Sequence, residues 1–272
     1  MRRICRPAVL AWVCAAGLSG HMTGQPAADT IRDSLNLRYG VAGIRGRVLD
    51  KDFYVINYSD RWRIPYWSAY LLTPELLKGT AKRRDSFRPD LDVPEEARST
   101  LEDYRGEGFD RGHLAPAGDF TRSRDAMATT FLLSNTSPQY HATNGGVWKQ
   151  LEAAVRAMVR DEGEAWIVSG DAFLHADGSP SRPAKWIPRG SKKRVAVPTH
   201  VFKALLTRDR EGCWTEYAFL VPNRPVSLGS PPRAYLVAVD TLEAKTGWDF
   251  FPLLEDSLEN RLESQQPAVW PW

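Results

Sequence analysis

The sequence predicts a single mixed α+β domain. Its 272 residues are 43% apolar and 25% charged, which is ordinary globular usage and excludes a disordered chain and a polytopic membrane protein. Segments rich in β-branched and aromatic residues alternate with segments of helical periodicity within one span. The chain shows no internal repeat and no low-complexity block. One domain is therefore expected rather than two.

Residues 1–28 have the pattern of a secretory signal peptide. They contain three Arg and no acidic residue, and a compact apolar run (residues 8–19) follows the basic start. That run is too short to span a bilayer comfortably. We expect cleavage between about residues 19 and 28, a mature domain over residues 29–272, and a secreted or periplasmic protein that does not associate with the membrane. The alternative is a mitochondrial transit peptide, which also carries Arg and lacks acids.

Removal of this leader changes the charge of the chain. The formal net charge of +3 falls to zero, because three Arg and no acid are lost. Cys5 and Cys14 are lost as well, so a buried, inert thiol is expected at Cys213. The remaining basic residues are concentrated in residues 182–210, which hold nine Lys and Arg against Asp209 alone. Such a strip suits a phosphate backbone; a solvated face is the alternative.

The expected elements follow the chain in order. Strands are predicted at residues 52–58 and 65–73, separated by a polar turn, and a long charged loop follows at residues 80–108. Helices are predicted at residues 123–133 and 147–160. Later strands are expected at residues 166–169, 195–206, 214–221 and 235–239. A helix capped by Asp240 and an acidic helical tail beyond Pro252 complete the chain.

The stretch DRGHLAPAGD (residues 110–119) is the most informative part of the sequence. Phosphodiester hydrolysis needs a base that is neutral near pH 7, and the imidazole of His113 suits that role. Negative charge develops on the non-bridging oxygens, so cations must lie close. Arg side chains can bind those oxygens in bidentate fashion. Asp110 and Asp119 are expected to be structural turn or cap residues.

Asn144 and Glu152 carry oxygens of the kind that Mg²⁺ prefers. Mg²⁺ keeps most of its waters, so one or two protein oxygens suffice to hold it. The Asn144 carbonyl can bind the metal directly, and the Glu152 carboxylate can hold its waters. On one continuous helix the two residues would lie ~12 Å apart along the axis. The chain must therefore turn before the helix, and the pair Gly145–Gly146 makes such a turn plausible.

Together these motifs resemble the DNA/RNA non-specific endonucleases, which include secreted sugar-non-specific bacterial nucleases and mitochondrial endonuclease G. The resemblance rests on DRGHLAPAGDF (110–120), SNTSPQ (134–139), N-x-x-x-W-x-x-L-E (144–152), FRPD (87–90) and VPTHVFKALL (197–206). It covers roughly residues 38–255. It implies a central antiparallel sheet and a ββα-metal finger, in which two strands, one bearing the His, precede a helix bearing the metal-binding Asn.

The resemblance also implies roles for individual residues. His113 would be the general base, Asn144 the only direct protein ligand of Mg²⁺, and Glu152 a ligand through water. Asn135 would support the reacting centre, and Arg111 would face the phosphate or the metal waters. Arg83 would contact phosphate, although the adjacent Arg84 leaves this choice open by one residue. Further substrate-binding candidates are Arg84, Arg88, Lys192, Lys193 and Arg194.

The expected activity is Mg²⁺-dependent hydrolysis of DNA and RNA to 5′-phosphate products, with Mn²⁺ as a substitute cation. A homodimer and a protein inhibitor remain open as partners. The alternative is a catalytically silent, secreted nucleic-acid-binding protein on the same scaffold, against which the intact His113, Asn144 and Glu152 argue. A zinc hydrolase would need three converging ligands, and the sequence has no H-x-x-x-H spacing. His141 and His175 lack such a constellation, and His200 lies in an apolar pattern typical of a core His.

Overall fold

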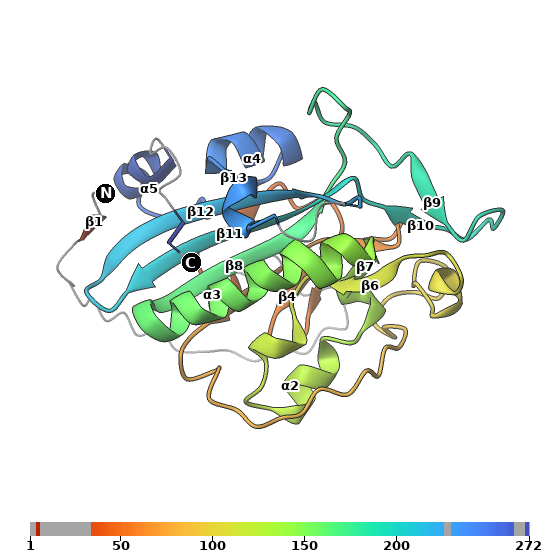
Figure 1. Ribbon diagram of the computed structural model, residues 1–272, viewed down its shortest axis with the longest axis horizontal. Helices are drawn as coiled ribbons and strands as arrows, with labels where there is room; N and C mark the ends of the chain where they lie inside the picture. The colour runs from red at the N-terminus through yellow and green to blue at the C-terminus, as the bar shows by residue number, and fades with distance from the viewer. Residues whose placement is uncertain (1–3, 6–33, 226–229, 264–269, 272) are drawn as a thin grey trace, which may run out of the picture.

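The protein is built on one twisted antiparallel sheet, shown in the computed structural model of Figure 1. The structure describes residues 4–5, 34–225, 230–263 and 270–271; most of the expected leader lies outside them. The strands run in the order β1-β12-β11-β8-β5-β4-β3, and β13 pairs with β12. The main-sheet strands are β1 (Ile4–Cys5), β3 (Arg47–Asp50), β4 (Val55–Ser59), β5 (Ile64–Leu72), β8 (Gly163–Ala172), β11 (His200–Asp209), β12 (Cys213–Pro222) and β13 (Leu236–Val237).

Among the described residues, three two-stranded pairs and four α-helices surround this sheet. The pairs join β2 (Val41–Ala42) with β14 (Asp249–Phe250), β6 (Asp110–His113) with β7 (Thr136–Gln139), and β9 (Lys185–Ile187) with β10 (Val195–Val197). The helices are α2 (Arg124–Thr129), α3 (Lys149–Glu162), α4 (Val239–Thr246) and α5 (Asp256–Glu263). The mixed α+β class and the central antiparallel sheet are confirmed. No described helix is long and apolar enough to cross a membrane.

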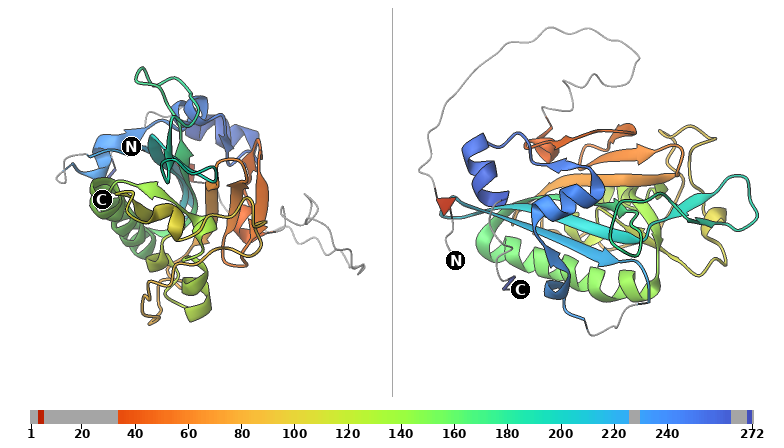
Figure 2. Two further views of the ribbon diagram at one scale, coloured as in Figure 1. Left: turned by 90° about the vertical axis from the view of Figure 1, so that its right-hand side faces the viewer. Right: turned by 90° about the horizontal axis from the view of Figure 1, so that it is seen from above.

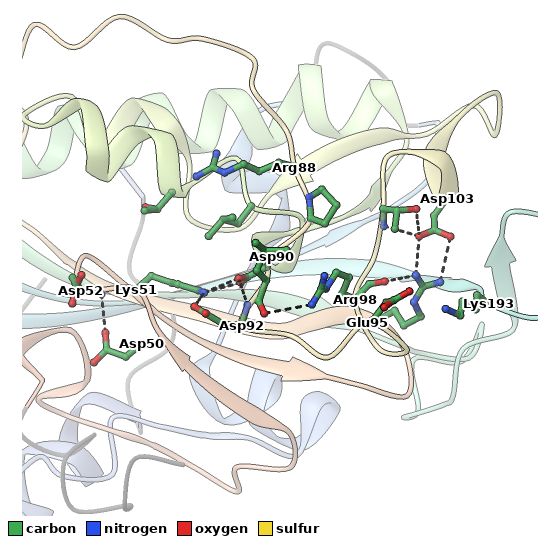
Figure 3. A pocket seen from close by; sticks show the side chains of 16 residues that line it. Asp50, Lys51, Asp52, Arg88, Asp90, Asp92, Glu95, Arg98, Asp103 and Lys193 are labelled. Carbon is green, nitrogen blue, oxygen red and sulfur yellow. Dashed lines mark hydrogen bonds and ion pairs between the residues drawn. The ribbon is translucent and has the colours of Figure 1, made fainter. Parts of the chain in front are cut away.

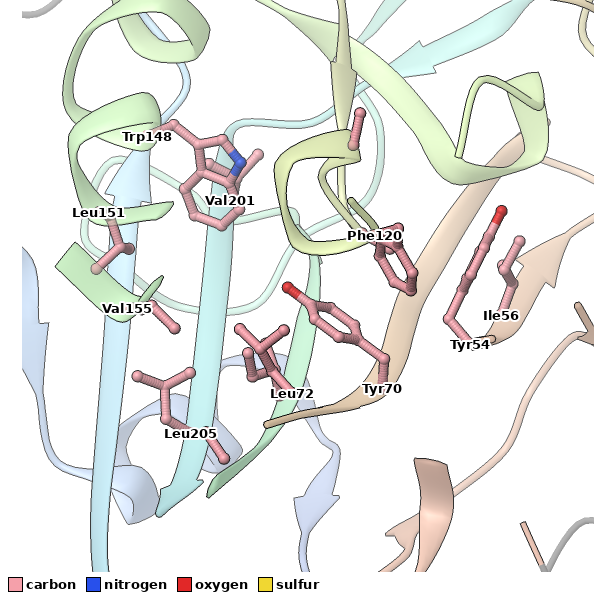
Figure 4. Close-up of a cluster of buried hydrophobic side chains, with 14 of the residues drawn as sticks. Tyr54, Ile56, Tyr70, Leu72, Phe120, Trp148, Leu151, Val155, Val201 and Leu205 are labelled. Carbon is pink, nitrogen blue, oxygen red and sulfur yellow. The ribbon is translucent and has the colours of Figure 1, made fainter. Parts of the chain in front are cut away.

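Alternating side chains of the central strands bury both faces of the sheet. On β11, Val201 and Leu205 face the apolar stripe of α3, while Phe202 and Leu206 face the opposite layer. Figure 4 shows the first layer, in which Trp148, Leu151 and Val155 meet Tyr70 and Leu72. The second layer is covered by α4 and α5, which lie across the sheet from α3 (Figure 2). Because both faces are covered, α3 is held rigidly against the sheet along its length.

Some predicted elements differ in detail. The apolar run 195–206 is divided into β10 and β11, because Pro198 lacks an N–H for the ladder. Helix α2 ends at Thr129, earlier than expected. Helix α4 begins at Val239 with Ala238 as its N-cap, so Asp240 lies in the first turn and is not the cap.

The sequence suggests a buried, inert thiol at Cys213. This prediction is wrong, because Cys213 is disulfide-bonded. Strand β1 adds to the edge of the sheet beside β12, and its backbone register places Cys5 opposite Cys213. Cleavage of a leader after about residue 19 would remove β1. Retention of this strand and removal of the leader are therefore mutually exclusive states of the chain.

Candidate active site

Strands β6 and β7 form a hairpin that is followed directly by a helical segment (Figure 1). Asp110 pairs with Gln139 and His113 with Thr136 across this hairpin. The helical segment begins with a π-helix, η5 (Thr143–Trp148), which carries Asn144, and continues as α3, which carries Glu152. Two strands and a helix therefore bring the DRGH residues beside the Asn144 turn, as the resemblance implies.

His113 lies at the end of β6 in a narrow aromatic slot. Its ring is 5.1 Å from that of Phe87 and 5.0 Å from that of Phe131, measured between centroids. The residue is only 7% exposed, and its Nε2 has no hydrogen-bond partner among the described residues. Its backbone carbonyl accepts a hydrogen bond of 3.3 Å from Trp148 Nε1, which ties the strand to the helix. The imidazole is thus fixed in place and has unused hydrogen-bonding capacity.

The surroundings of His113 keep it neutral. Burial lowers its pKa to about 3, and the cations Arg83 and Arg111 add to the lowering, while Asp85 opposes it. An imidazole with this pKa carries no proton at neutral pH, so it can accept one. The imidazole of His113 is therefore unprotonated near pH 7, and its role as the general base stays a prediction.

Two Arg side chains flank the aromatic slot. Arg111 lies on the same face of β6 as His113, two residues away, and its guanidinium is 4.6 Å from the Phe87 ring centroid. Its Nε is buried without a partner among the described residues. Arg83 lies 5.4 Å from the Phe131 centroid and donates to Asp85 at 2.7 Å. Each Arg thus stacks on one of the two rings that hold His113, a placement suited to clamping an anion over the imidazole.

Asn144 is oriented by Asp110. The Asn144 Nδ2 donates a hydrogen bond of 2.9 Å to Asp110 Oδ2, which leaves the Asn144 Oδ1 without a donor in the described part of the chain. His141 Nδ1 lies 2.8 Å from the same carboxylate oxygen. Asp110 therefore binds two side chains rather than the backbone amides of its turn. His141, for which the sequence suggested no such neighbours, belongs to this group.

The turn expected at the Gly pair is present. Gly146 has non-helical φ and ψ angles of −99° and −113°, so the chain kinks between Asn144 and the start of α3. The Thr143 hydroxyl contacts the carbonyls of Pro222 and Arg224 at 3.1 and 3.0 Å. The kink and this anchor set the position of Asn144 independently of the axis of α3.

Glu152 lies in the first turn of α3 among buried charges. Burial raises its pKa to about 7, while Lys203 acts in the opposite direction. Arg83 also lowers the pKa of Glu152, so this one cation acts on both Glu152 and His113. Lys203 is itself fully buried, 4.8 Å from the Trp148 ring centroid, and donates to Ser169 Oγ. The positive charge of Lys203 therefore favours the ionised form of Glu152.

Asp119 extends this charged group. It accepts a hydrogen bond from Tyr70 at 2.7 Å and forms a 2.8 Å ion pair with Arg156, one turn beyond Glu152 on α3. Asp119 is structural, as predicted, but it binds side chains and does not cap a helix.

Asn135 is hydrogen-bonded on all sides by groups of the protein itself. It is fully buried in the short 3₁₀ helix η4 (Leu133–Asn135). Its Oδ1 accepts hydrogen bonds from Ser68 Oγ and Ala115 N, and its Nδ2 donates to the carbonyls of Ala115 and Thr130. With all four interactions made inside the protein, Asn135 positions the segment that follows His113. These contacts support a positioning role, and a catalytic role of Asn135 stays a prediction.

The predicted substrate-binding residues are divided between different places. Arg84 is exposed beside Arg83, but only Arg83 is close enough to act on His113. Arg88 donates to the Ala128 carbonyl at 2.8 Å and, with Lys193, lines a separate cavity of about 840 Å³ (Figure 3). That cavity contains six carboxylates, and two of its cations are paired, Lys51 with Asp90 and Arg63 with Asp103. The charge of this cavity does not favour a polyanion, and substrate binding by Arg88 stays a prediction.

The basic strip 182–210 is not one surface. Lys192, Lys193 and Arg194 lie in the loop between β9 and β10, and Arg194 stacks on Trp186 at 5.4 Å. Lys203 is buried behind Glu152. Arg208 pairs with Glu164, and Arg210 donates to the Arg160 carbonyl. Only the part on and around β9 and β10 remains available to bind nucleic acid.

The donor set fits Mg²⁺. The Asn144 Oδ1 accepts no hydrogen bond from a described residue, and the Glu152 carboxylate, in the described part of the chain, forms no hydrogen bond. Oxygen donors of this kind, one amide and one carboxylate, suit a hard cation that retains waters. A second group of ligand-type side chains, Asp209, Glu211 and Cys213, lies at the β11–β12 turn. There the Asp209 carboxylate already accepts the backbone N–H of Glu211 and Cys213, so it does not fit a metal.

A comparison with known proteins decides the family. Residues 33–257 match the family model for DNA/RNA non-specific endonucleases. The chain belongs to this family. It is 35% identical to nuclease C1 of Cunninghamella echinulata var. echinulata, over 81% of this chain and 89% of that protein. It is 36% identical to human mitochondrial endonuclease G, over 79% of this chain and 72% of that protein.

The fold agrees with this assignment. A chain in the crystal structure of the EndoG/EndoGI complex, which concerns EndoG inhibition, superimposes with a TM-score of 0.77 and 28% identity, covering 90% of this chain and 100% of that one. As a family member this DNA/RNA non-specific endonuclease is a hydrolase of nucleic acids. Sequence reasoning missed Lys203, Arg156 and His141. Helical spacing from Glu152 could have indicated Arg156, whereas Lys203 and His141 meet the site only through the fold.

Proposed function

We propose that this endonuclease is an Mg²⁺-dependent, sugar-non-specific enzyme that hydrolyses DNA and RNA to 5′-phosphate products. The observation that carries the proposal is the buried, neutral imidazole of His113 held between two aromatic rings, each bearing a stacked Arg. Arg83 acts on both His113 and Glu152, which links the base to the carboxylate beside the Asn144 turn.

The chemistry of the chain's own residues follows from these contacts. Arg83 and Arg111 bind the non-bridging oxygens of the scissile phosphate. Burial and, after it, the cations Arg83 and Arg111 lower the pKa of His113. The negative charge of the phosphate offsets the two cations, so substrate binding raises the base strength of the imidazole. His113 then takes a proton from a water molecule. The water oxygen forms a bond to phosphorus, the bond from phosphorus to the 3′ oxygen breaks, and the phosphate stays on the 5′ side.

Asn144 would hold Mg²⁺ directly, and Glu152 would hold it through water. The bound cation supplies positive charge that stabilises the transition state and the departing 3′ oxygen. Asp110 accepts a hydrogen bond from the Asn144 amide nitrogen. This contact leaves the Asn144 carbonyl oxygen available for the cation. Lys203 favours the ionised form of Glu152, because its positive charge opposes the rise in pKa that burial causes.

We also propose that the protein is exported from the cell. The acid-free, Arg-bearing start and compact apolar run support secretion. A mitochondrial destination is the alternative, since endonuclease G relatives are mitochondrial. N-terminal sequencing of the protein recovered from the culture medium and periplasm tests this point. An N-terminus between about residues 19 and 28 supports the leader; a protein that retains residue 4 and stays inside the cell contradicts it.

The activity is tested by digesting supercoiled plasmid and a long RNA with the purified protein in Mg²⁺, in Mn²⁺ and in EDTA. We expect cleavage of both substrates with either cation, none in EDTA, and products that a 5′-phosphate-dependent ligase rejoins. Retention of nucleic acid without cleavage in Mg²⁺ would support the silent binding protein instead. We also propose that a protein inhibitor can bind this enzyme. Candidate inhibitors are mixed with the enzyme, and cleavage of the same plasmid is measured.

A further inference from the structure

A cationic cavity, of about 400 Å³, lies beside strand β9. Its lining consists of three Arg (Arg45, Arg61 and Arg182), three aromatic residues (Trp62, Tyr66 and Trp186), Ser181 and Pro183. No acidic residue is among them. This composition differs from that of the cavity in Figure 3, where six carboxylates face the space. The β9 cavity therefore has the charge and the flat apolar surfaces that suit a nucleotide.

The three guanidinium groups lack counter-charges. Arg45, Arg61 and Arg182 are all exposed, and none forms an ion pair with a carboxylate in the described ranges. The nearby carboxylate of Asp60 is already engaged by Arg47, at 3.2 and 2.8 Å. Three cations around one small space raise the local potential and attract an anion. Because the guanidinium is a planar fork, the best match is a phosphate or a carboxylate.

The aromatic rings are held in place by their own packing. Trp62 makes edge contacts with Tyr66 at 5.1 Å and with Phe173 at 4.8 Å. Tyr66 in turn packs against Trp248, over which Arg45 lies at 4.5 Å. Both Trp62 and Trp186 remain partly exposed. Preformed ring faces bind a base with little loss of side-chain freedom, and arginines beside them select a nucleic acid over a simple carboxylate.

The cavity is connected to the active site through β9 and β10. Adjacent residues of a strand point to opposite faces. Lys185 donates to the Tyr140 hydroxyl at 2.9 Å, next to the His141 and Asn144 turn, whereas Trp186 lines the cavity. Strand β10 is held to the cavity by the hydrogen bond from Ala196 N to the Trp62 carbonyl, 3.0 Å long. One nucleic-acid strand leaving the active site over Lys185 can therefore pass around β9, at the right-hand end of Figure 1, into the cavity.

We infer that this cavity is an exosite that binds a nucleotide of the same strand, away from the scissile bond. The Arg side chains bind its phosphate and the Trp faces stack on its base. The identity of the ligand rests on the proposed function, but its binding can be measured without catalysis. Long single strands should therefore bind more tightly than strands that occupy the active site alone.

The test is fluorescence anisotropy of a labelled single-stranded DNA of about 30 nucleotides, a length that exceeds one binding site of this kind. It is measured in EDTA, so that no cleavage occurs. Arg61→Gln combined with Arg182→Gln should raise the Kd about tenfold at low salt. The same variant should lower the slope of log Kd against log salt by about 0.7, because the two Arg bind one phosphate and each lost phosphate contact removes about 0.7 on single strands. Trp186→Leu, which removes a ring but no charge, should raise the Kd and leave the salt slope as in the parent.

The matched control is Arg38→Gln combined with Arg210→Gln. It removes two charges from exposed positions near the β11–β12 turn. Its Kd should stay within about twofold of the parent at moderate salt, where distant charges are screened. Equal losses in the two double variants, or parent-like binding and salt slope after the Arg61 and Arg182 changes, would overturn the exosite. Plasmid cleavage by the parent in Mg²⁺ is scored separately, so a parent that binds but does not cleave contradicts the proposed function and not the exosite.

Discussion

The Asn144 amide donates a 2.9 Å hydrogen bond to the Asp110 carboxylate, so the first residue of β6 orients a side chain 34 positions later in the sequence. This contact assigns the amide nitrogen to the protein and leaves the oxygen for a cation. It also explains why an acid precedes the Arg of the DRGH motif in this chain. The same carboxylate oxygen lies 2.8 Å from His141 Nδ1.

Asp110→Ala should therefore weaken the binding of Mg²⁺. We expect the Mg²⁺ concentration for half-maximal plasmid cleavage to rise by about 10- to 100-fold, the usual cost of removing a group that orients a metal ligand. Activity at saturating Mg²⁺ should fall less. His141→Ala is the matched control, because His141 touches the same carboxylate but its side chain is 84% exposed. A parent-like Mg²⁺ titration for Asp110→Ala would show that Asn144 is not oriented in this way.

Asn135→Ala should destabilise the fold. The substitution leaves the buried groups of Ser68, Ala115 and Thr130 without their partner, and we expect a loss of about 2–4 kcal/mol in the free energy of unfolding. Ser68→Ala removes only one of these bonds and should cost about 1 kcal/mol. Urea unfolding in EDTA compares the two variants with the parent. If Asn135→Ala is as stable as the parent but inactive, Asn135 acts in catalysis and not in positioning.

The buried imidazole should make stability depend on pH. The pKa of His113 is lowered from 6.5 to about 3, first by burial and then by Arg83 and Arg111. The folded state therefore binds fewer protons than the unfolded state between these values. Its stabilising contribution is fully present above pH 6.5 and is lost as the pH falls toward 3. His113→Phe should lessen the loss of unfolding free energy between pH 7 and pH 4.5 by about 2 kcal/mol.

The His113 comparison is made by urea unfolding at each pH in EDTA. His175→Phe is the control, because His175 lies in a loop outside this site. Identical pH profiles for His113→Phe and the parent would mean that the imidazole is not held neutral by the fold.

Gly112→Ala should disturb the hairpin that carries His113. A Cβ at Gly112 would lie 2.1 Å from the Gln139 side-chain carbon. Gln139 is fully buried, and its amide atoms have no partner among the described residues. We expect a loss of about 1–3 kcal/mol in stability, typical of overpacking, together with reduced activity. Adding Gln139→Ala to Gly112→Ala should restore much of both losses in a double-mutant cycle. If no rescue occurs, Gly112 is required for a reason other than the contact with Gln139.

The fold class and the main site residues were accessible from the sequence because they depend on local patterns. The β-branched and aromatic residues of β4 and β5, the helical stripe of α3 and the spacing of His113, Asn144 and Glu152 are all visible in the printed chain. The kink at Gly146 could be predicted from helix geometry, since a straight helix separates Asn144 from Glu152 too far. Local periodicity and backbone chemistry determine these features.

Other features required the tertiary structure. Lys203 is an ordinary member of a basic strip until β11 packs against α3 and buries it beside Trp148. Arg88 sits in a motif but is turned toward the Ala128 carbonyl by the pairing of its backbone with residues 131–133. Asn135 has a side chain of a type that occurs in catalytic sites, but its four hydrogen bonds are all formed with groups of the protein itself. The burial of each of these side chains, and the direction in which it points, determine what it contacts. The sequence pattern does not encode either of them.

We propose that His113 is the base and that Asn144 holds the cation. The single-turnover rate of plasmid cleavage for His113→Ala and Asn144→Ala, measured across a Mg²⁺ titration, tests both roles. We expect His113→Ala to lower the rate by ~10²–10⁴ with an unchanged Mg²⁺ dependence, whereas Asn144→Ala should lower the rate and shift the Mg²⁺ dependence together. A folded His113→Ala variant with undiminished cleavage, or an Asn144→Ala variant whose titration matches the parent, would contradict this proposal.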